Sequence, residues 1–152
     1  MNVSVVCVGG LKEKFFKDAC AEYTKRLSRF GKIAVTEVDE CRLGEGQDAE
    51  KEGELILKKI NPSALKVALC VEGKKASSEG LAKLVSDAGI NGKSEICFVI
   101  GGSDGLSDKV KSACDVRLSF SDMTFPHQLM RVILLEQVYR AFKINAGEKY
   151  HK

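Results

Sequence analysis

The sequence predicts an α/β fold in which a parallel-rich sheet carries helices on both faces. Two observations predict this class. Short runs of apolar and β-branched residues alternate along the chain with segments whose apolar residues recur at helical spacing. The apolar runs are continuous instead of alternating with polar residues, which is typical of parallel strands buried on both sides. The chain has 152 residues, so we expect residues 1–152 to form a single domain.

The continuous apolar runs are the predicted strands. They cover residues 3–8, 33–38, 65–71, 95–100 and 116–120. Ligands of parallel sheets bind outside the carboxyl ends of the strands. The loops after the third, fourth and fifth runs are therefore the first places to look for a binding site.

Local start and stop signals bound the predicted helices. Ser77 opens the third helix, Ser107 caps a short fourth helix, and Pro126 lies near the first turn of the last one. A polar loop over residues 39–48 precedes the second helix, and Pro62 ends this helix. The longer predicted helices cover residues 11–30, 49–60, 78–88 and 125–145.

The net charge of +3 is too small to indicate a nucleic-acid-binding protein by itself. Basic residues nevertheless gather in and after the first helix, seven of them against three acidic residues. This cluster is either an electrostatic contact surface for RNA or an ordinary solvated helix face. The basic residues are Lys12, Lys14, Lys17, Lys25, Arg26, Arg29 and Lys32.

Cysteine spacing and charge placement indicate a cytoplasmic protein without a metal site. The start of the chain has no basic segment of the kind found in signal peptides, and charged residues interrupt its most apolar stretch, residues 125–144. No two cysteines form a C-x-x-C pair, and no histidine lies at zinc-ligand spacing. Cys7, Cys70 and Cys97 lie inside apolar runs, so we expect them to be small buried thiols in a reducing compartment. The cysteines are Cys7, Cys20, Cys41, Cys70, Cys97 and Cys114.

The last predicted helix is apolar around nearly its whole circumference, so both of its sides must be covered. One side can face the sheet. The other side either meets a second copy of the chain in a twofold homodimer or is covered by other helices of the same chain. The homodimer is our hypothesis.

Two loops are candidates for a ligand site. Residues 100–108 contain Gly101, Gly102 and Gly105, and glycines after a buried strand allow close approach of a ligand to the backbone. The same glycines are compatible with a simple tight turn. Residues 120–127 mix apolar and polar side chains, so they could enclose an adenine ring between Phe120 and Phe125. The alternative is an ordinary loop leading into a helix.

Cationic and aromatic side chains follow these loops. Arg131 and Arg140 lie on an apolar helix, where they are costly unless they pair, reach solvent or bind an anion. Tyr150 and His151 lie in a tail that could grip phosphate and stack on a base. A frayed, solvated terminus is the alternative for this tail.

Several motifs together resemble the SPOUT methyltransferases, and among them the bacterial enzymes that methylate a pseudouridine of large-subunit ribosomal RNA. The motifs are the glycine loop, the segment 121–127, the helix 131–141 and the end 150–152. The resemblance covers the whole chain and is strongest from Cys97 onward. It implies a C-terminal trefoil knot, an exception to the rule that chains are unknotted. It also implies a homodimer and S-adenosylmethionine as the cofactor.

The resemblance further implies a reaction and a set of site residues. The reaction is methylation at N3 of a pseudouridine in large-subunit (23S) ribosomal RNA, on the assembled ribosome. The cofactor would contact a residue that ends the third strand, the glycine loop after the fourth strand, and the loop before the last helix. The matching positions are Leu69, Gly101, Phe120, Ser121, Asp122, Met123, Thr124 and Phe125.

Neither the residue types nor the resemblance identifies the group that removes the N3 proton. Arg131, Tyr150 and His151 are candidates for positioning the nucleotide, and His127 is a weaker candidate for the base. Two other functions remain open. One is a non-enzymatic ribosome-associated dimer. The other is a nucleotide-dependent oxidoreductase, which the missing G-x-G-x-x-G fingerprint disfavours.

Overall fold

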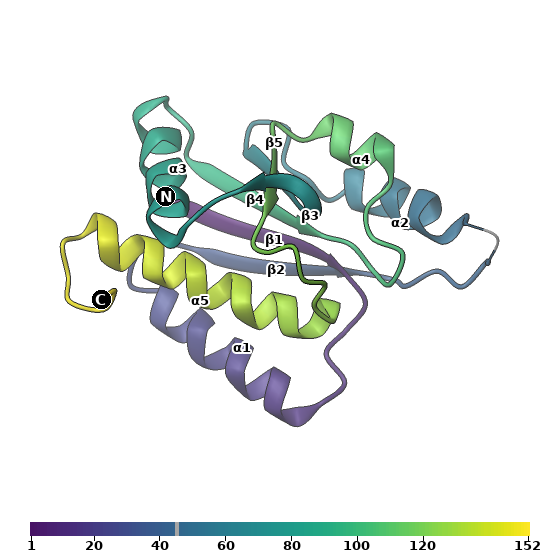
Figure 1. Ribbon diagram of the computed structural model, residues 1–152, viewed down its shortest axis with the longest axis horizontal. Coiled ribbons are helices and arrows are strands. Elements are labelled where there is room, and N and C mark those ends of the chain that lie inside the picture. The colour runs from purple at the N-terminus through teal and green to yellow at the C-terminus, as the bar shows by residue number, and fades with distance from the viewer. Residues whose placement is uncertain (45) are drawn as a thin grey trace.

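The computed structural model describes residues 1–44 and 46–152, so the predicted polar loop lies partly outside the described residues. The described residues form a five-stranded sheet with the order β2-β1-β4-β3-β5 (Figure 1). All four neighbouring pairs of strands are parallel, which confirms the predicted class. The strands are β1 (Asn2–Val8), β2 (Ile33–Val38), β3 (Leu65–Lys75), β4 (Glu95–Ile100) and β5 (Val116–Ser119).

Helices cover both faces of this sheet, as the sequence predicts. On one face α1, α3 and α5 pack on side chains such as Val5 and Phe98. On the other face α2 and α4 pack on side chains such as Val6 and Val99. Alternate residues of one strand therefore serve two separate cores. The helices are α1 (Lys14–Leu27), α2 (Asp48–Leu57), α3 (Ser78–Ile90), α4 (Asp108–Ala113) and α5 (His127–Asn145).

Both predicted serine caps are present. The Ser77 hydroxyl accepts a hydrogen bond from the Gly80 N–H at 3.0 Å, and the Ser107 hydroxyl accepts one from the Val110 N–H at 3.3 Å. The predicted bounds of α1 extend three residues too far at each end, and the predicted end of α2 lies three residues too late. The apolar pattern continues past the end of α1 because Phe30 packs on the core from outside the helix.

The third strand is longer than its apolar run because it continues beyond its partner β4. Leu69 pairs with Ile100, the last residue of β4. Beyond Leu69 the register of β3 with β5 shifts, and Lys74 pairs with the same Leu118 that faces Leu69. At Gly73 a Cβ atom would lie 2.7 Å from the Leu118 carbonyl carbon, so the returning backbone packs closely on β5. Residues 70–73 thus leave the regular ladder at the carboxyl edge of the sheet.

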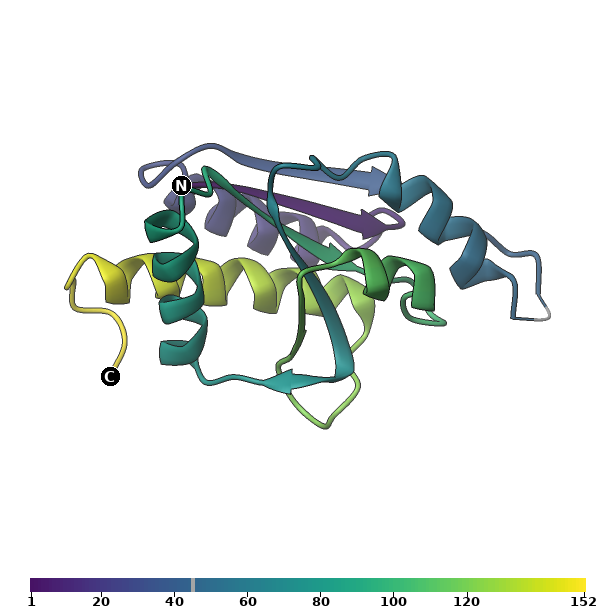
Figure 2. The same cartoon turned by 90° about the horizontal axis from the view of Figure 1, so that it is seen from above.

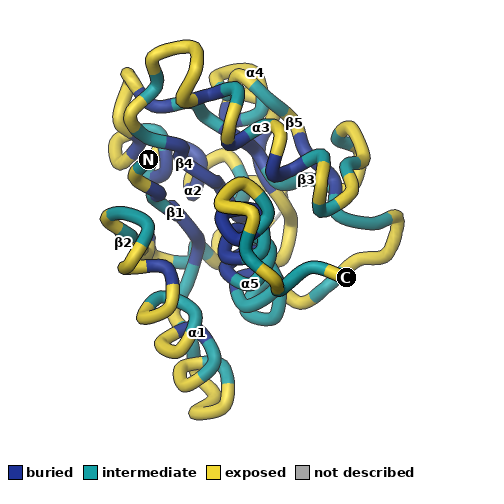
Figure 3. The backbone as a smooth tube through the Cα atoms, turned by 90° about the vertical axis from the view of Figure 1, so that its left-hand side faces the viewer, coloured by how far each residue is buried: buried dark blue, intermediate teal, exposed yellow. Residues whose placement is uncertain are grey.

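The last helix lies between α1 and α3 and rests on β4 (Figures 1 and 2). Many residues of α5 are buried, as are the central strands, which the dark blue segments of Figure 3 show. The chain itself therefore covers much of the apolar helix. Leu129, Val132 and Ile133 remain half-buried. The second copy of the chain stays a prediction, and so does the trefoil knot.

Candidate functional site

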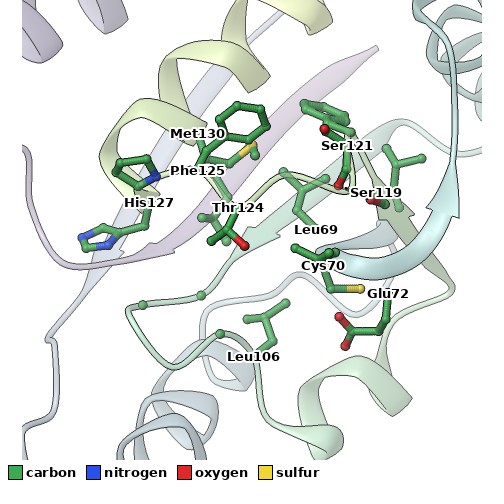
Figure 4. Close-up of a pocket in the computed structure, with 18 of the residues that line it drawn as sticks. Leu69, Cys70, Glu72, Leu106, Ser119, Ser121, Thr124, Phe125, His127 and Met130 are labelled. Carbon is green, nitrogen blue, oxygen red and sulfur yellow. Dashed lines mark hydrogen bonds between the residues drawn. The ribbon is translucent and has the colours of Figure 1, made fainter.

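A cavity of about 650 Å³ opens at the carboxyl edge of the sheet (Figure 4). The middle of β3, the loop after β4, the end of β5 and the start of α5 form its walls. Its volume lies within the range of small-molecule sites, which is roughly 300–1,000 Å³. The cavity is lined by residues 69–72, 100–106, 111, 118–121, 123–127 and 130.

The glycine loop is a tight turn and also a wall of this cavity. The Gly105 N–H donates to the Gly102 carbonyl at 3.0 Å, and Gly105 has a φ of +75°, which favours glycine. A Cβ atom on Gly101 would lie 2.5 Å from the carbonyl carbon of Gly105. The loop is therefore a tight turn and a candidate ligand contact at once, because the turn places its backbone at the cavity.

The segment before α5 forms the opposite wall. The Ser119 hydroxyl donates to the Ser121 carbonyl at 3.0 Å, and the Met123 N–H donates to the Ser121 hydroxyl at 3.0 Å. These bonds shape a compact turn. Asp122 does not line the cavity, because its carboxylate is exposed and pairs with Lys75 at 2.5 Å. The other seven predicted cofactor-contact residues all line it: Leu69, Gly101, Phe120, Ser121, Met123, Thr124 and Phe125.

Of the four candidate catalytic residues, His127 lines the cavity. It is the first residue of α5 and lies beside the cavity in Figure 4. Its Nε2 lies 3.8 Å from the position that a Cβ atom on Gly9 would occupy. Arg131, one turn further along α5, does not line this cavity. It is buried against Glu37 and the carbonyl oxygen of Gly9.

The two tail candidates pack on the side of α5 and α3. The Tyr150 hydroxyl donates to Glu136 Oε1 at 3.0 Å, and burial together with this bond raises the pKa of Tyr150 to about 12. His151 Nε2 lies 2.7 Å from Glu79 Oε1. The His151 Nδ1 lies 3.2 Å from Arg140 Nη1. Within one chain, neither tail side chain lines the cavity.

Sequence reasoning missed an ion pair in the cavity wall. The Lys111 ammonium donates to the Glu72 carboxylate, and both residues line the cavity. This bond lowers the pKa of Glu72 and raises the pKa of Lys111. Glu72 directly follows the predicted third run, residues 65–71, where the topology rule points, although β3 itself continues through it. No local signal singles out Lys111, because it reaches the cavity from α4.

The cysteines form no disulfide in the part of the chain that the structure describes, and one of them lines the cavity. Cys7 and Cys97 are buried as small apolar side chains. Cys70, which was also expected to be buried, is half-buried because it faces the cavity. Burial raises the pKa of the Cys7 thiol to about 11. In residues 1–44 and 46–152, no three His, Cys, Asp or Glu side chains gather where they could hold a metal ion. No helix among these residues is long and apolar enough to cross a membrane.

Comparison with curated proteins finds full-length relatives. The chain is 54% identical over 159 residues to "Ribosomal RNA large subunit methyltransferase H" of Bacillus pumilus. It is 52% identical over 159 residues to the protein of the same name from Clostridium novyi. Each alignment covers 100% of this chain and 100% of the relative.

Solved structures share the fold at low sequence identity. A "probable methylase family protein" from Haemophilus influenzae aligns with a TM-score of 0.58 and 14% identity, over 99% of this chain and 70% of that one. The tRNA (m1G37) methyltransferase from Aquifex aeolicus aligns with a TM-score of 0.54 and 15% identity, over 92% of this chain and 70% of that one. These likenesses support the fold alone.

The family model described as "Predicted SPOUT methyltransferase" matches residues 1–151. This match spans every strand and helix of the domain, including both loops that form the cavity. Together with the full-length relatives, it shows that the chain belongs to the SPOUT methyltransferase family.

Proposed function

We propose that this chain transfers a methyl group from S-adenosylmethionine to N3 of a pseudouridine in large-subunit ribosomal RNA, on the assembled ribosome. One observation carries the proposal. The glycine loop and the segment before α5, which are 20 residues apart in sequence, face each other across one cavity at the carboxyl edge of a SPOUT-family sheet. The name of the full-length relatives, a ribosomal RNA large subunit methyltransferase, supports large-subunit ribosomal RNA as the substrate.

The cavity suits a nucleoside-containing cofactor. Leu69, Leu118 and Met130 supply apolar surface, and Ser121 and Thr124 supply polar groups. Such a mixture of mostly apolar walls with a few polar groups is typical of cofactor sites. Among the solved structures of the same fold, that of protein Lpg2936 from Legionella pneumophila contains bound SAM.

The bound cofactor would supply a methyl group on a sulfonium, a good leaving group. Transfer would form the N3–carbon bond and break the carbon–sulfur bond, and a base would accept the proton that N3 gives up. The cavity walls must hold N3 at roughly 3–3.5 Å from the methyl carbon, in line with the sulfur. His127 is the group to test as the base, because it is the candidate that lines the cavity.

The proposal includes a cytoplasmic homodimer of this single domain, built through α5. Leu129, Val132 and Ile133 are half-buried apolar residues on that helix, and a second copy would cover them. The competing function is a ribosome-associated dimer without enzymatic activity. That alternative assigns no role to the cavity.

The test is transfer of labelled methyl from S-adenosylmethionine to ribosomes that lack the modification. Separated large subunits and free RNA are assayed in parallel, and calorimetry measures cofactor binding. Label in the large-subunit RNA of assembled ribosomes, and in no other substrate, is the expected result. If no substrate takes up label and calorimetry detects no cofactor binding, the non-enzymatic dimer replaces this proposal.

A further inference from the structure

The side chain of Glu52 lies buried beneath the glycine loop, outside the cavity that the proposed function uses. It belongs to α2 and is 3% exposed. Its Oε2 accepts a hydrogen bond from the Cys41 N–H at 3.0 Å. Its Oε1 is buried and has no hydrogen-bond partner among the described residues. An unpaired buried carboxyl oxygen is destabilising, so the presence of Glu52 at this position needs a physical explanation.

The Glu52 carboxyl group lies so close to Gly102 that it leaves little room for a side chain there. A Cβ atom on Gly102 would lie 3.1 Å from Glu52 Oε1 and 3.2 Å from Oε2, which is closer than ordinary contact. Gly102 lines the cavity, and Glu52 does not. The carboxyl group therefore supports the backbone of the loop without reaching the ligand space.

Gly53, the next residue of α2, allows this helix to lie close to the far end of the glycine loop as well. A Cβ atom on Gly53 would lie 2.6 Å from the Ser107 hydroxyl oxygen and 3.0 Å from Val110 Cγ2. Ser107 is the N-cap of α4, directly after the loop. Glu52 and Gly53 thus bring α2 against both ends of the segment 102–107.

The surroundings of Glu52 favour its uncharged form. Burial raises its pKa, and the nearby carboxylates of Glu40, Asp48 and Asp104 raise it further. The hydrogen bond from the Cys41 N–H acts in the opposite direction. Glutamine has the same shape as glutamate and keeps an oxygen that can accept the bond from the Cys41 N–H, so it should replace Glu52 with little loss.

We infer that Glu52 is a positioning residue for the cofactor: through its contact with Gly102 it fixes the backbone of residues 101–106 at the cavity wall. This inference rests on the proposed function. A loop that has lost this support samples positions displaced from the binding geometry, and displacements of about 1 Å are sufficient to weaken binding and catalysis strongly.

The test measures the affinity for S-adenosylmethionine of the native protein and of three single variants by calorimetry. We expect Glu52→Ala to lower the affinity about ten-fold and Glu52→Gln to retain it within about two-fold. Glu54→Ala is the matched control, because Glu54 lies on the same helix but is exposed and pairs with Lys51. In steady-state assays the KM for S-adenosylmethionine should rise in Glu52→Ala, while the KM for ribosomes stays constant.

A double-variant experiment tests the contact itself. Gly102→Ala places a methyl group against the carboxyl oxygens, so it should weaken cofactor binding. In the Glu52→Ala background the two carboxyl oxygens are gone and only Val8 Cγ1, 3.1 Å from the Cβ position, remains as a close neighbour. Gly102→Ala should therefore cost less affinity there than in the native protein.

Equal costs in both backgrounds, or native affinity in a folded Glu52→Ala variant, would overturn the inference. Loss of affinity in Glu52→Gln as large as in Glu52→Ala would also overturn it. If the native protein itself fails to bind S-adenosylmethionine, the proposed function fails instead, so the two failures are distinguishable.

Discussion

Arg131 and Glu37 form an ion pair between the last helix and the second strand, with Arg131 Nη1 2.9 Å from Glu37 Oε1. The second terminal nitrogen of Arg131 donates to the carbonyl oxygen of Gly9 at 2.9 Å. Arg131 is 2% exposed, so these bonds offset the cost of burying a guanidinium group. The pair ties α5 to the carboxyl ends of β1 and β2, close to the cavity.

Replacement of Arg131 by alanine should lower the free energy of unfolding by about 1–3 kcal/mol. The variant leaves the Gly9 carbonyl without its partner, whereas half-exposed Glu37 can be hydrated. Urea unfolding measures the change. Lys14→Ala is the control, because the Lys14–Asp18 pair is exposed and should contribute less than about 0.5 kcal/mol. Similar losses in both variants would contradict the structural role of Arg131.

Replacement of Gly101 by alanine should weaken cofactor binding by about ten-fold or more, because the new methyl group would meet the Gly105 backbone, which cannot rotate away. Calorimetric titration with S-adenosylmethionine checks this expectation. Gly92→Ala is the control. Gly92 has a φ of +80° and open space around it, so alanine there should cost about 1–2 kcal/mol of stability with unchanged cofactor affinity.

The raised pKa of Glu52 predicts how stability depends on pH. The folded protein holds the Glu52 proton more tightly than the unfolded chain does. The resulting stabilisation is complete below the ordinary carboxyl pKa of 4.5 and is lost as the pH rises through the raised pKa. The free energy of unfolding of the native protein should therefore fall relative to Glu52→Gln as the pH rises above 4.5. A constant or growing advantage of the native protein would contradict this expectation.

Tyr150 should anchor the tail mainly through its ring. Its ring packs edge-on against Tyr139 with centroids 4.9 Å apart, and the Arg140 guanidinium lies 4.7 Å from its centroid. We expect Tyr150→Phe to cost about 1 kcal/mol of stability, through the lost bond to Glu136, and Tyr150→Ala about 2 kcal/mol. Thermal unfolding measures both. Equal losses in the two variants would assign the anchoring to the hydroxyl group.

Local patterns were sufficient to predict the element order, the parallel class and the two serine caps. Each of these depends on residues close together in sequence, such as Ser107 and Val110. The position of Gly101 and Phe125 at one cavity was also predictable, because the carboxyl ends of parallel strands lie at the same edge of a sheet. The sequence by itself thus determined the architecture and most of the cavity wall.

Only the tertiary structure decided which distant side chains meet. Arg131 pairs with Glu37, which is 94 residues away in sequence, and Lys111 pairs with Glu72, which is 39 residues away. Glu52 reaches the glycine loop because glycine at position 53 allows α2 to approach α4. These contacts depend on how the helices pack on the sheet. Local sequence patterns, such as apolar periodicity and helix caps, do not determine that packing.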